Sequence, residues 1–148
     1  MKTILFNLRI NDVEKFELFK VTLGEICSCF DECYFKIRGS FAEECVSYVY
    51  KVFQRNRVRD FQSLPENDWA QATLKMLEEV KSRSVYLYFE DHKLISGTNK
   101  LKEVLEEFDH NKLDYLCYSF FNANKLKSYN LLPLDPSIGK SIDNFKVD

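Results

Sequence analysis

The sequence is poor in glycine and proline, with only four and three of these residues in 148. Glycine-rich phosphate loops need closely spaced glycines, and neither G-x-x-x-x-G-K-S/T nor G-x-G-x-x-G occurs in this chain. The G-x-S-x-G turn that presents a nucleophilic serine is also absent. These absences argue against protein kinases, P-loop proteins and dinucleotide-dependent oxidoreductases.

Long apolar runs and an excess of basic residues are missing as well. No apolar stretch approaches the roughly 20 residues that span a bilayer. The apolar run near the N-terminus is interrupted by Asn7 and Arg9, which is unlike a signal peptide. Lys and Arg total 21 against 23 Asp and Glu, a formal charge of −2, whereas nucleic-acid-binding domains are usually basic. We therefore expect a cytoplasmic protein with no membrane span and no nucleic-acid partner.

The cysteines are odd in number, and most lie inside apolar patterns. This usage favours reduced thiols packed in a cytosolic core over a disulfide framework. A zinc site near Cys27, Cys29 and Cys33 is disfavoured, because no second matching pair of ligands follows at the usual spacing. The five cysteines are Cys27, Cys29, Cys33, Cys45 and Cys117.

Hydrophobic periodicity alternates between strand-like and helix-like along the chain. This order predicts an α/β fold with a mainly parallel sheet flanked by helices on both faces. The length fits a single domain over 1–148, with an irregular C-terminal segment from about 130. Strand patterns cover 3–9, 32–39, 58–64, 85–89 and 113–121, and helical stripes cover 16–30, 41–53, 69–80 and 101–108.

Polar residues just before these helical stripes predict where the helices begin. Asn11 and Asp12 are candidate caps of the first helix, and Ser40 to Glu43 matches a capping box for the second. Asp68 to Gln71 resembles a capping box for the third. Trp69 belongs to the apolar stripe of that third helix, which we interpret as core packing.

The run Val85 to Phe89 is continuously apolar and ends abruptly at Glu90, Asp91 and His92. Such a run is expected of a central strand that is covered on both faces. Ligands of open parallel sheets lie beyond the carboxyl ends of the strands. Carboxylates placed there can hold a divalent cation that neutralises a diphosphate. The alternative is that Glu90 and Asp91 are solvated loop residues, with Asp91 capping the next turn.

The order of elements, together with the segment DWAQATLKMLEEVKSRSVYLYFEDH, resembles the nucleotide-sugar half of GT-A-fold glycosyltransferases over roughly residues 1–125. In that family, a buried strand ends in an Asp-x-Asp-like motif that binds metal and sugar nucleotide. The resemblance implies a fold like that of the nucleotide-diphospho-sugar transferases. It also implies that Asp91, assisted by Glu90 and His92, binds Mn or Mg. His92 stands where the family usually has a second aspartate.

The resemblance further implies that the nucleotide faces the loop after the first strand and the end of the second. Arg9, Asn11, Arg38 and Gly39 are the residues at those positions. Arginines there could donate charge-assisted hydrogen bonds to phosphate. Taken singly, each arginine is better interpreted as an exposed residue at a strand end. The family's second half, which supplies the acceptor site and often the catalytic base, has no counterpart here, and no catalytic residue is predicted.

The function predicted from these features is transfer of a sugar from a nucleotide-diphosphate donor. The alternative is a non-catalytic, GT-A-like module that binds a partner and lacks the acceptor half. A receiver-like or flavodoxin-like fold also fits the alternation of elements. This sequence, however, lacks the functional site that those two folds carry at the end of the first strand.

Overall fold

The structure is a computed structural model, and it groups the chain into two compact units, Met1–Thr98 and Asn99–Asp148, each of which is described by itself. Placement is described for residues 1–65, 68–90, 92–94, 97–112, 131–133 and 145–147.

The first unit is built on a four-stranded sheet in which all neighbouring strands are parallel. The order across the sheet is β3-β2-β1-β4. The α/β class and the parallel sheet predicted from the sequence are therefore confirmed for this unit. The strands are β1 (Thr3–Arg9), β2 (Glu32–Arg38), β3 (Val58–Asp60) and β4 (Val85–Leu87).

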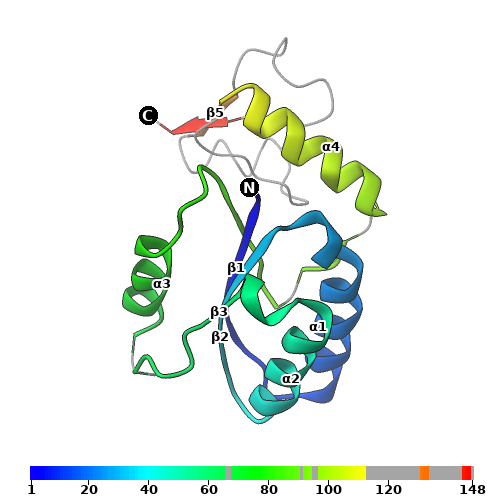
Figure 1. Ribbon diagram of the computed structural model, residues 1–148, viewed down its shortest axis with the longest axis vertical. Helices are drawn as coiled ribbons and strands as arrows, with labels where there is room; N and C mark the ends of the chain where they lie inside the picture. The colour runs from blue at the N-terminus through cyan, green and yellow to red at the C-terminus, as the bar shows by residue number, and fades with distance from the viewer. Residues whose placement is uncertain (66–67, 91, 95–96, 113–130, 134–144, 148) are drawn as a thin grey trace. The chain divides into compact units, whose positions relative to one another are not determined.

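Helices cover both faces of this sheet (Figure 1). Helices α1 (Val13–Ile26) and α2 (Ala42–Val52) lie on one face, and α3 (Trp69–Glu78) lies on the other. This arrangement follows from right-handed crossovers. The chain moves one way from β1 to β2 to β3, and then returns across the sheet to β4.

Aromatic rings fill the core on the α1/α2 face. Phe6 lies in the middle of β1 and contacts the rings of Phe19, Phe35 and Tyr88, with centroids 5.9–6.0 Å apart. All four side chains are buried. Burial of such rings contributes strongly to stability, and edge-on contacts add about 0.5–1.5 kcal/mol per pair. These four rings thus form one aromatic cluster between the sheet and the helices of this face.

The α3 face has a smaller apolar core. Leu5, Tyr34 and Met76 form its buried centre. Three polar side chains are buried on the same face, toward the carboxyl ends of the strands: Asn7, Lys36 and Thr73. Further apolar side chains pack around the centre: Phe61, Leu64, Leu77, Val80 and Val85.

Two of the three predicted helix caps are confirmed. Asp12 accepts a hydrogen bond from the Lys15 N–H at 2.8 Å, and Asp68 accepts one from the Gln71 N–H at 3.1 Å. The prediction of a capping box that begins at Ser40 is wrong. Helix α2 begins after Phe41, which makes no side-chain capping bond. Ser40 instead forms part of the turn that leads into the helix.

Strand β4 differs from its prediction in two respects. It lies at the edge of the four-stranded sheet among the described residues, and not in the middle. It is also not covered on both faces, because Leu87 is 44% exposed and Phe89 is 37% exposed. Tyr88 between them is buried against Phe6, so the strand alternation continues past Leu87. The predicted strand at 113–121 lies outside the described residues.

The second unit contains most of α4 (Gly97–His110) and two short strands. Leu101 and Val104 are the buried residues of the helix, in agreement with the predicted stripe. Strands β5 (Leu131–Pro133) and β6 (Phe145–Val147) pair in antiparallel fashion. This pairing was not predicted from the sequence.

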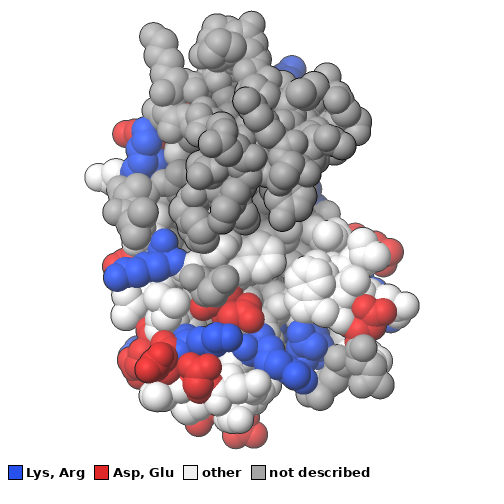
Figure 2. Space-filling model, turned by 180° about the vertical axis from the view of Figure 1, so that it is seen from behind, with Lys and Arg blue, Asp and Glu red and all other residues white. Residues whose placement is uncertain are grey.

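Charges of both signs share the protein surface. On the face shown in Figure 2, basic and acidic side chains are interspersed over the part that belongs to described residues. This distribution agrees with the small net charge of −2. Within the described part of the chain, no helix combines the length and the apolar character needed to cross a membrane.

Candidate functional site at the carboxyl edge of the sheet

The carboxyl edge of the sheet has a topological switch point between β1 and β4. From β1 the chain crosses through α1 to β2 on one side, whereas α3 delivers β4 to the other side. In open α/β sheets, ligands bind beyond the carboxyl ends of the strands near the point where the strand order reverses. The residues that follow β1, β2 and β4 at this edge are therefore candidate ligand contacts.

The loops after β1 and β2 are bound to each other by backbone hydrogen bonds. The Ile10 N–H donates to the Arg38 carbonyl at 2.8 Å, and the Phe41 N–H donates to the Ile10 carbonyl at 3.1 Å. Asn11 Oδ1 accepts from the Ser40 N–H at 3.3 Å. The two loops therefore form one surface at the carboxyl edge.

Gly39 is required by this close approach. Its φ is +104°, a conformation that L side chains rarely adopt. A Cβ at this position would lie 2.3 Å from the Ile10 carbonyl oxygen and 2.5 Å from Asn11 Oδ1. The structure thus brings together two of the predicted nucleotide-binding residues, Asn11 and Gly39.

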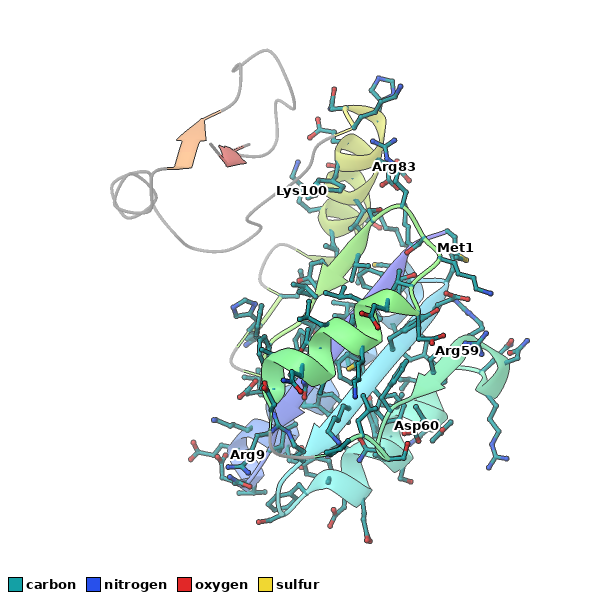
Figure 3. All side chains as sticks on the ribbon, turned by 90° about the vertical axis from the view of Figure 1, so that its left-hand side faces the viewer. Met1, Arg9, Arg59, Asp60, Arg83 and Lys100 are labelled. Atoms are coloured by element: carbon teal, nitrogen blue, oxygen red, sulfur yellow. The ribbon has the colours of Figure 1, made fainter. Side chains whose placement is uncertain are left out.

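Arg9 and Arg38 end neighbouring strands and are register partners. Side chains at paired positions leave the same face of a sheet. That face is the α3 face, because Asn7, two residues before Arg9, contacts Thr73 of α3. Two arginine side chains thus leave the same face at this end of the sheet, and guanidinium groups donate charge-assisted hydrogen bonds to anions. Figure 3 shows Arg9 at this end of the sheet.

Trp69 hydrogen-bonds the edge of β1 that faces the switch point. Tyr88 N–H donates to the Leu5 carbonyl at 3.0 Å, so Leu5 directs its carbonyl toward β4. Alternate residues of a parallel strand bond to the same neighbour, so the Asn7 carbonyl also faces the β4 side. Strand β4 has ended there, and the indole Nε1 of Trp69 donates to the Asn7 carbonyl at 2.7 Å. The indole N–H therefore takes the place of a backbone N–H that a longer β4 would supply to Asn7.

Where β3 ends, a side chain likewise makes the hydrogen bonds that strand backbone would otherwise make. The side-chain amide of Gln62 accepts from the Ile37 N–H at 2.6 Å and donates to the Ile37 carbonyl at 2.8 Å. Buried Lys36 also holds this loop, because its Nζ donates to the Leu64 carbonyl at 2.6 Å and to the Gln62 carbonyl at 3.4 Å. Side chains thus complete the carboxyl edge where β3 and β4 are too short.

The segment after β4 turns away along α1. His92 N–H donates to the Phe89 carbonyl at 3.1 Å, and the two rings meet edge to face. The Thr22 hydroxyl donates to the His92 carbonyl at 3.5 Å. Thr22 lies roughly 15 Å along the helix from the Asp12 cap. His92 is therefore distant from the loop of Asn11.

The acidic part of the predicted metal site is described only in part. Glu90 is partly exposed in the turn after β4, and Asp91 lies outside the described residues. Among the residues that are described, no group of three or more His, Cys, Asp or Glu side chains is placed to hold a metal ion. Mn or Mg binding at Glu90, Asp91 and His92 stays a prediction.

The cysteines of the described region are free thiols, as predicted. Cys29, Cys33 and Cys45 are buried, and Cys27 is partly exposed. Burial raises the pKa of the Cys33 thiol, and burial, assisted by Glu44, raises the pKa of Cys45 to about 12. Neutral thiols of this kind are core residues and not nucleophiles.

Sequence reasoning missed the buried polar residues near the carboxyl ends of β1 and β2. Asn7 and Lys36 interrupt strands that pack against helices on both faces, and such strands are normally apolar throughout. This interruption is the signal that could have identified them. Trp69 was assigned to the core, but it is 45% exposed. The helical spacing of Trp69 gave no sign that its indole bonds to the backbone at the carboxyl end of β1.

Comparisons with protein-family models, with curated proteins and with solved structures found no match to this chain.

Proposed function

We propose that the carboxyl edge of the four-stranded sheet binds a nucleoside diphosphate, and that the protein transfers a sugar from such a donor. The observation that supports binding most directly is the pair of register partners, Arg9 and Arg38, beside the β1/β4 switch point. Guanidinium groups donate planar, charge-assisted hydrogen bonds that fit phosphate oxygens.

The loop surface beside the arginines supports the same proposal. Gly39 permits the backbones after β1 and β2 to approach closely, which fixes the loop of Asn11 next to the strand ends of Arg9 and Arg38. Asn11 is exposed and fixed by the Ser40 N–H, which leaves its amide group available to a ribose or base. In this proposal, the diphosphate lies at Arg9 and Arg38.

Sugar transfer rests on the acidic strand end and on the resemblance to GT-A glycosyltransferases. Carboxylates of Glu90 and Asp91 could hold Mn or Mg, which would neutralise charge on the departing diphosphate. The chain's own residues then have two tasks, to orient the diphosphate through the arginines and to hold the cation through oxygen ligands. No residue is assigned as the catalytic base.

Calorimetry with uridine, adenosine and guanosine diphosphates, with and without Mn²⁺, tests the binding step. We expect saturable binding to the wild type and a loss of roughly 10- to 150-fold in affinity for Arg9→Gln, the range for one hydrogen bond to a charged group. Arg83→Gln is the matched control, because Arg83 is exposed at the opposite end of the sheet (Figure 3). Absence of binding, or equal losses for both variants, would refute the proposal.

A turnover assay separates an enzyme from the non-catalytic alternative. The assay measures nucleoside diphosphate released from uridine, adenosine and guanosine diphospho-sugars. Asp91→Asn should abolish release while leaving the circular dichroism spectrum unchanged. A wild-type protein that binds nucleotide without ever releasing diphosphate would instead be a binding module.

A further inference from the structure

The indole of Trp69 combines two properties that are rarely found together. The residue is 45% exposed, although it belongs to the first turn of a helix that packs on the sheet. It is nevertheless fixed, because Nε1 donates to the Asn7 carbonyl and the Asn7 side-chain amide donates back to the Trp69 carbonyl at 3.0 Å. A large aromatic side chain held rigidly with part of its surface in solvent is a preformed contact surface.

The position of the indole points to the kind of ligand that would use it. The Trp69 indole bonds the Asn7 carbonyl where a longer β4 would do so, at the switch point where α/β sheets receive ligands. Asn7, which holds the indole, precedes Arg9 by two residues on the same face of β1. A ligand that spans both features would combine a planar ring with an anionic group.

Other features of this edge of the sheet agree with a small ligand of that kind. Asn7 is 6% exposed, and its Oδ1 has no hydrogen-bond partner among the described residues. Leu87 at the end of β4 and Phe89 just after it leave further apolar surface exposed. Apolar walls with a few polar groups are typical of sites for cofactors and nucleotides.

We propose that Trp69 provides the stacking surface for the base of the bound nucleotide. This inference rests on the proposed function, because it takes the diphosphate to lie at Arg9. Base–aromatic stacking accepts any base, since every base presents a π-face. The contact should therefore raise affinity for nucleotides over pyrophosphate without selecting strongly among uracil, adenine and guanine.

Trp69 is the single tryptophan of the chain, so the intrinsic tryptophan fluorescence reports on this residue alone. We expect nucleoside diphosphates to quench this fluorescence saturably, and inorganic pyrophosphate to bind without quenching. By calorimetry, Trp69→Ala should lose roughly 5- to 150-fold in nucleoside diphosphate affinity, the range for one base stack. Its pyrophosphate affinity should remain unchanged.

Two variants guard against a purely structural effect. Trp69→Phe keeps a ring but loses the indole N–H, and should retain most of the nucleotide affinity. Leu74→Ala, on the same helix and 59% exposed, should bind like the wild type. Circular dichroism and the unfolding midpoint establish that each variant is folded.

The outcomes separate this inference from the proposed function. If the wild type binds nucleotides without a fluorescence change and Trp69→Ala binds them equally well, stacking is refuted while the binding function stands. Equal losses of nucleotide and pyrophosphate affinity in Trp69→Ala would also refute stacking, because the residue would then act on the phosphate site. If no nucleotide binds the wild type, the proposed function fails and stacking fails with it.

Discussion

Asn7 and Trp69 hold each other through two hydrogen bonds of opposite direction. The indole Nε1 donates to the Asn7 carbonyl at 2.7 Å, and the Asn7 amide donates to the Trp69 carbonyl at 3.0 Å. Thr73 joins this pair, since its hydroxyl accepts from the Asn7 amide at 2.9 Å and donates to the Trp69 carbonyl at 2.8 Å. The first turn of α3 is thereby fixed to the carboxyl end of β1.

Replacement of Thr73 tests this connection. Thr73→Val keeps the shape but removes the acceptor for the buried Asn7 amide, which should cost about 1–2 kcal/mol of unfolding free energy. Thr22→Val is the control, because Thr22 is also buried but its bond to the His92 carbonyl is long, at 3.5 Å. Urea denaturation measures both. A larger loss for Thr22→Val would contradict the assigned importance of the Asn7 network.

Lys36 should stabilise the loop between β3 and α3. Lys36→Met would leave the Leu64 and Gln62 carbonyls without their donor, at a cost of about 1–3 kcal/mol. Lys51→Met, in an exposed position on α2, should change stability by less than about 0.5 kcal/mol. Chemical denaturation compares the two variants, and an equal effect would show that the loop does not depend on Lys36.

The two glycines with positive φ should respond differently to alanine. Gly97→Ala meets nothing within 4 Å, so only its backbone conformation opposes the change, at about 1–2 kcal/mol. Gly39→Ala carries the same backbone cost and, in addition, a clash with the Ile10 carbonyl oxygen. Thermal unfolding should therefore show a clearly lower midpoint for Gly39→Ala. Similar midpoints for the two variants would mean that the loops after β1 and β2 can separate at little cost.

Stability should fall at alkaline pH because of buried thiols. The raised pKa values of Cys33 and Cys45 mean that these groups keep their protons in the folded state, whereas the unfolded chain loses them near the ordinary value of 9.0. Above about pH 9 the unfolded state then binds fewer protons, so the unfolding free energy decreases as pH rises toward 12.

The variant Cys45→Ala should show a shallower alkaline decrease than the wild type. Cys27→Ala, at a partly exposed position, provides the comparison. Urea unfolding at pH steps from 8 upward, under reducing conditions, measures the slope. Parallel curves for Cys45→Ala and the wild type would contradict the assignment.

The regular elements of the first unit follow from local sequence patterns. The strand predicted at 3–9 and the Asp12 and Asp68 caps are found, because alternation and capping act over a few residues. The Ser40 capping box fails because a longer-range contact prevails. Asn11 takes the Ser40 N–H, and the turn at Gly39 sets where α2 begins.

The candidate site was less accessible to sequence reasoning. A continuous apolar run predicts a strand but does not say which neighbours cover it, so the exposure of Leu87 and Phe89 was not foreseen. The two hydrogen bonds between Asn7 and Trp69 join residues 62 positions apart, and no periodic pattern in the sequence encodes them. Arg9 and Arg38 could be named from strand ends, but their direct pairing required the register.

The strand order has a consequence for synthesis of the protein. Strand β1 leaves the ribosome before the other strands, yet one of its two neighbours, Val85–Leu87, is translated roughly eighty residues later. Until then, one edge of the nascent β1 strand lacks its native neighbouring strand, and unpaired strand edges are prone to non-native pairing. Nascent chains truncated before position 85 should therefore depend on chaperones far more than the finished protein.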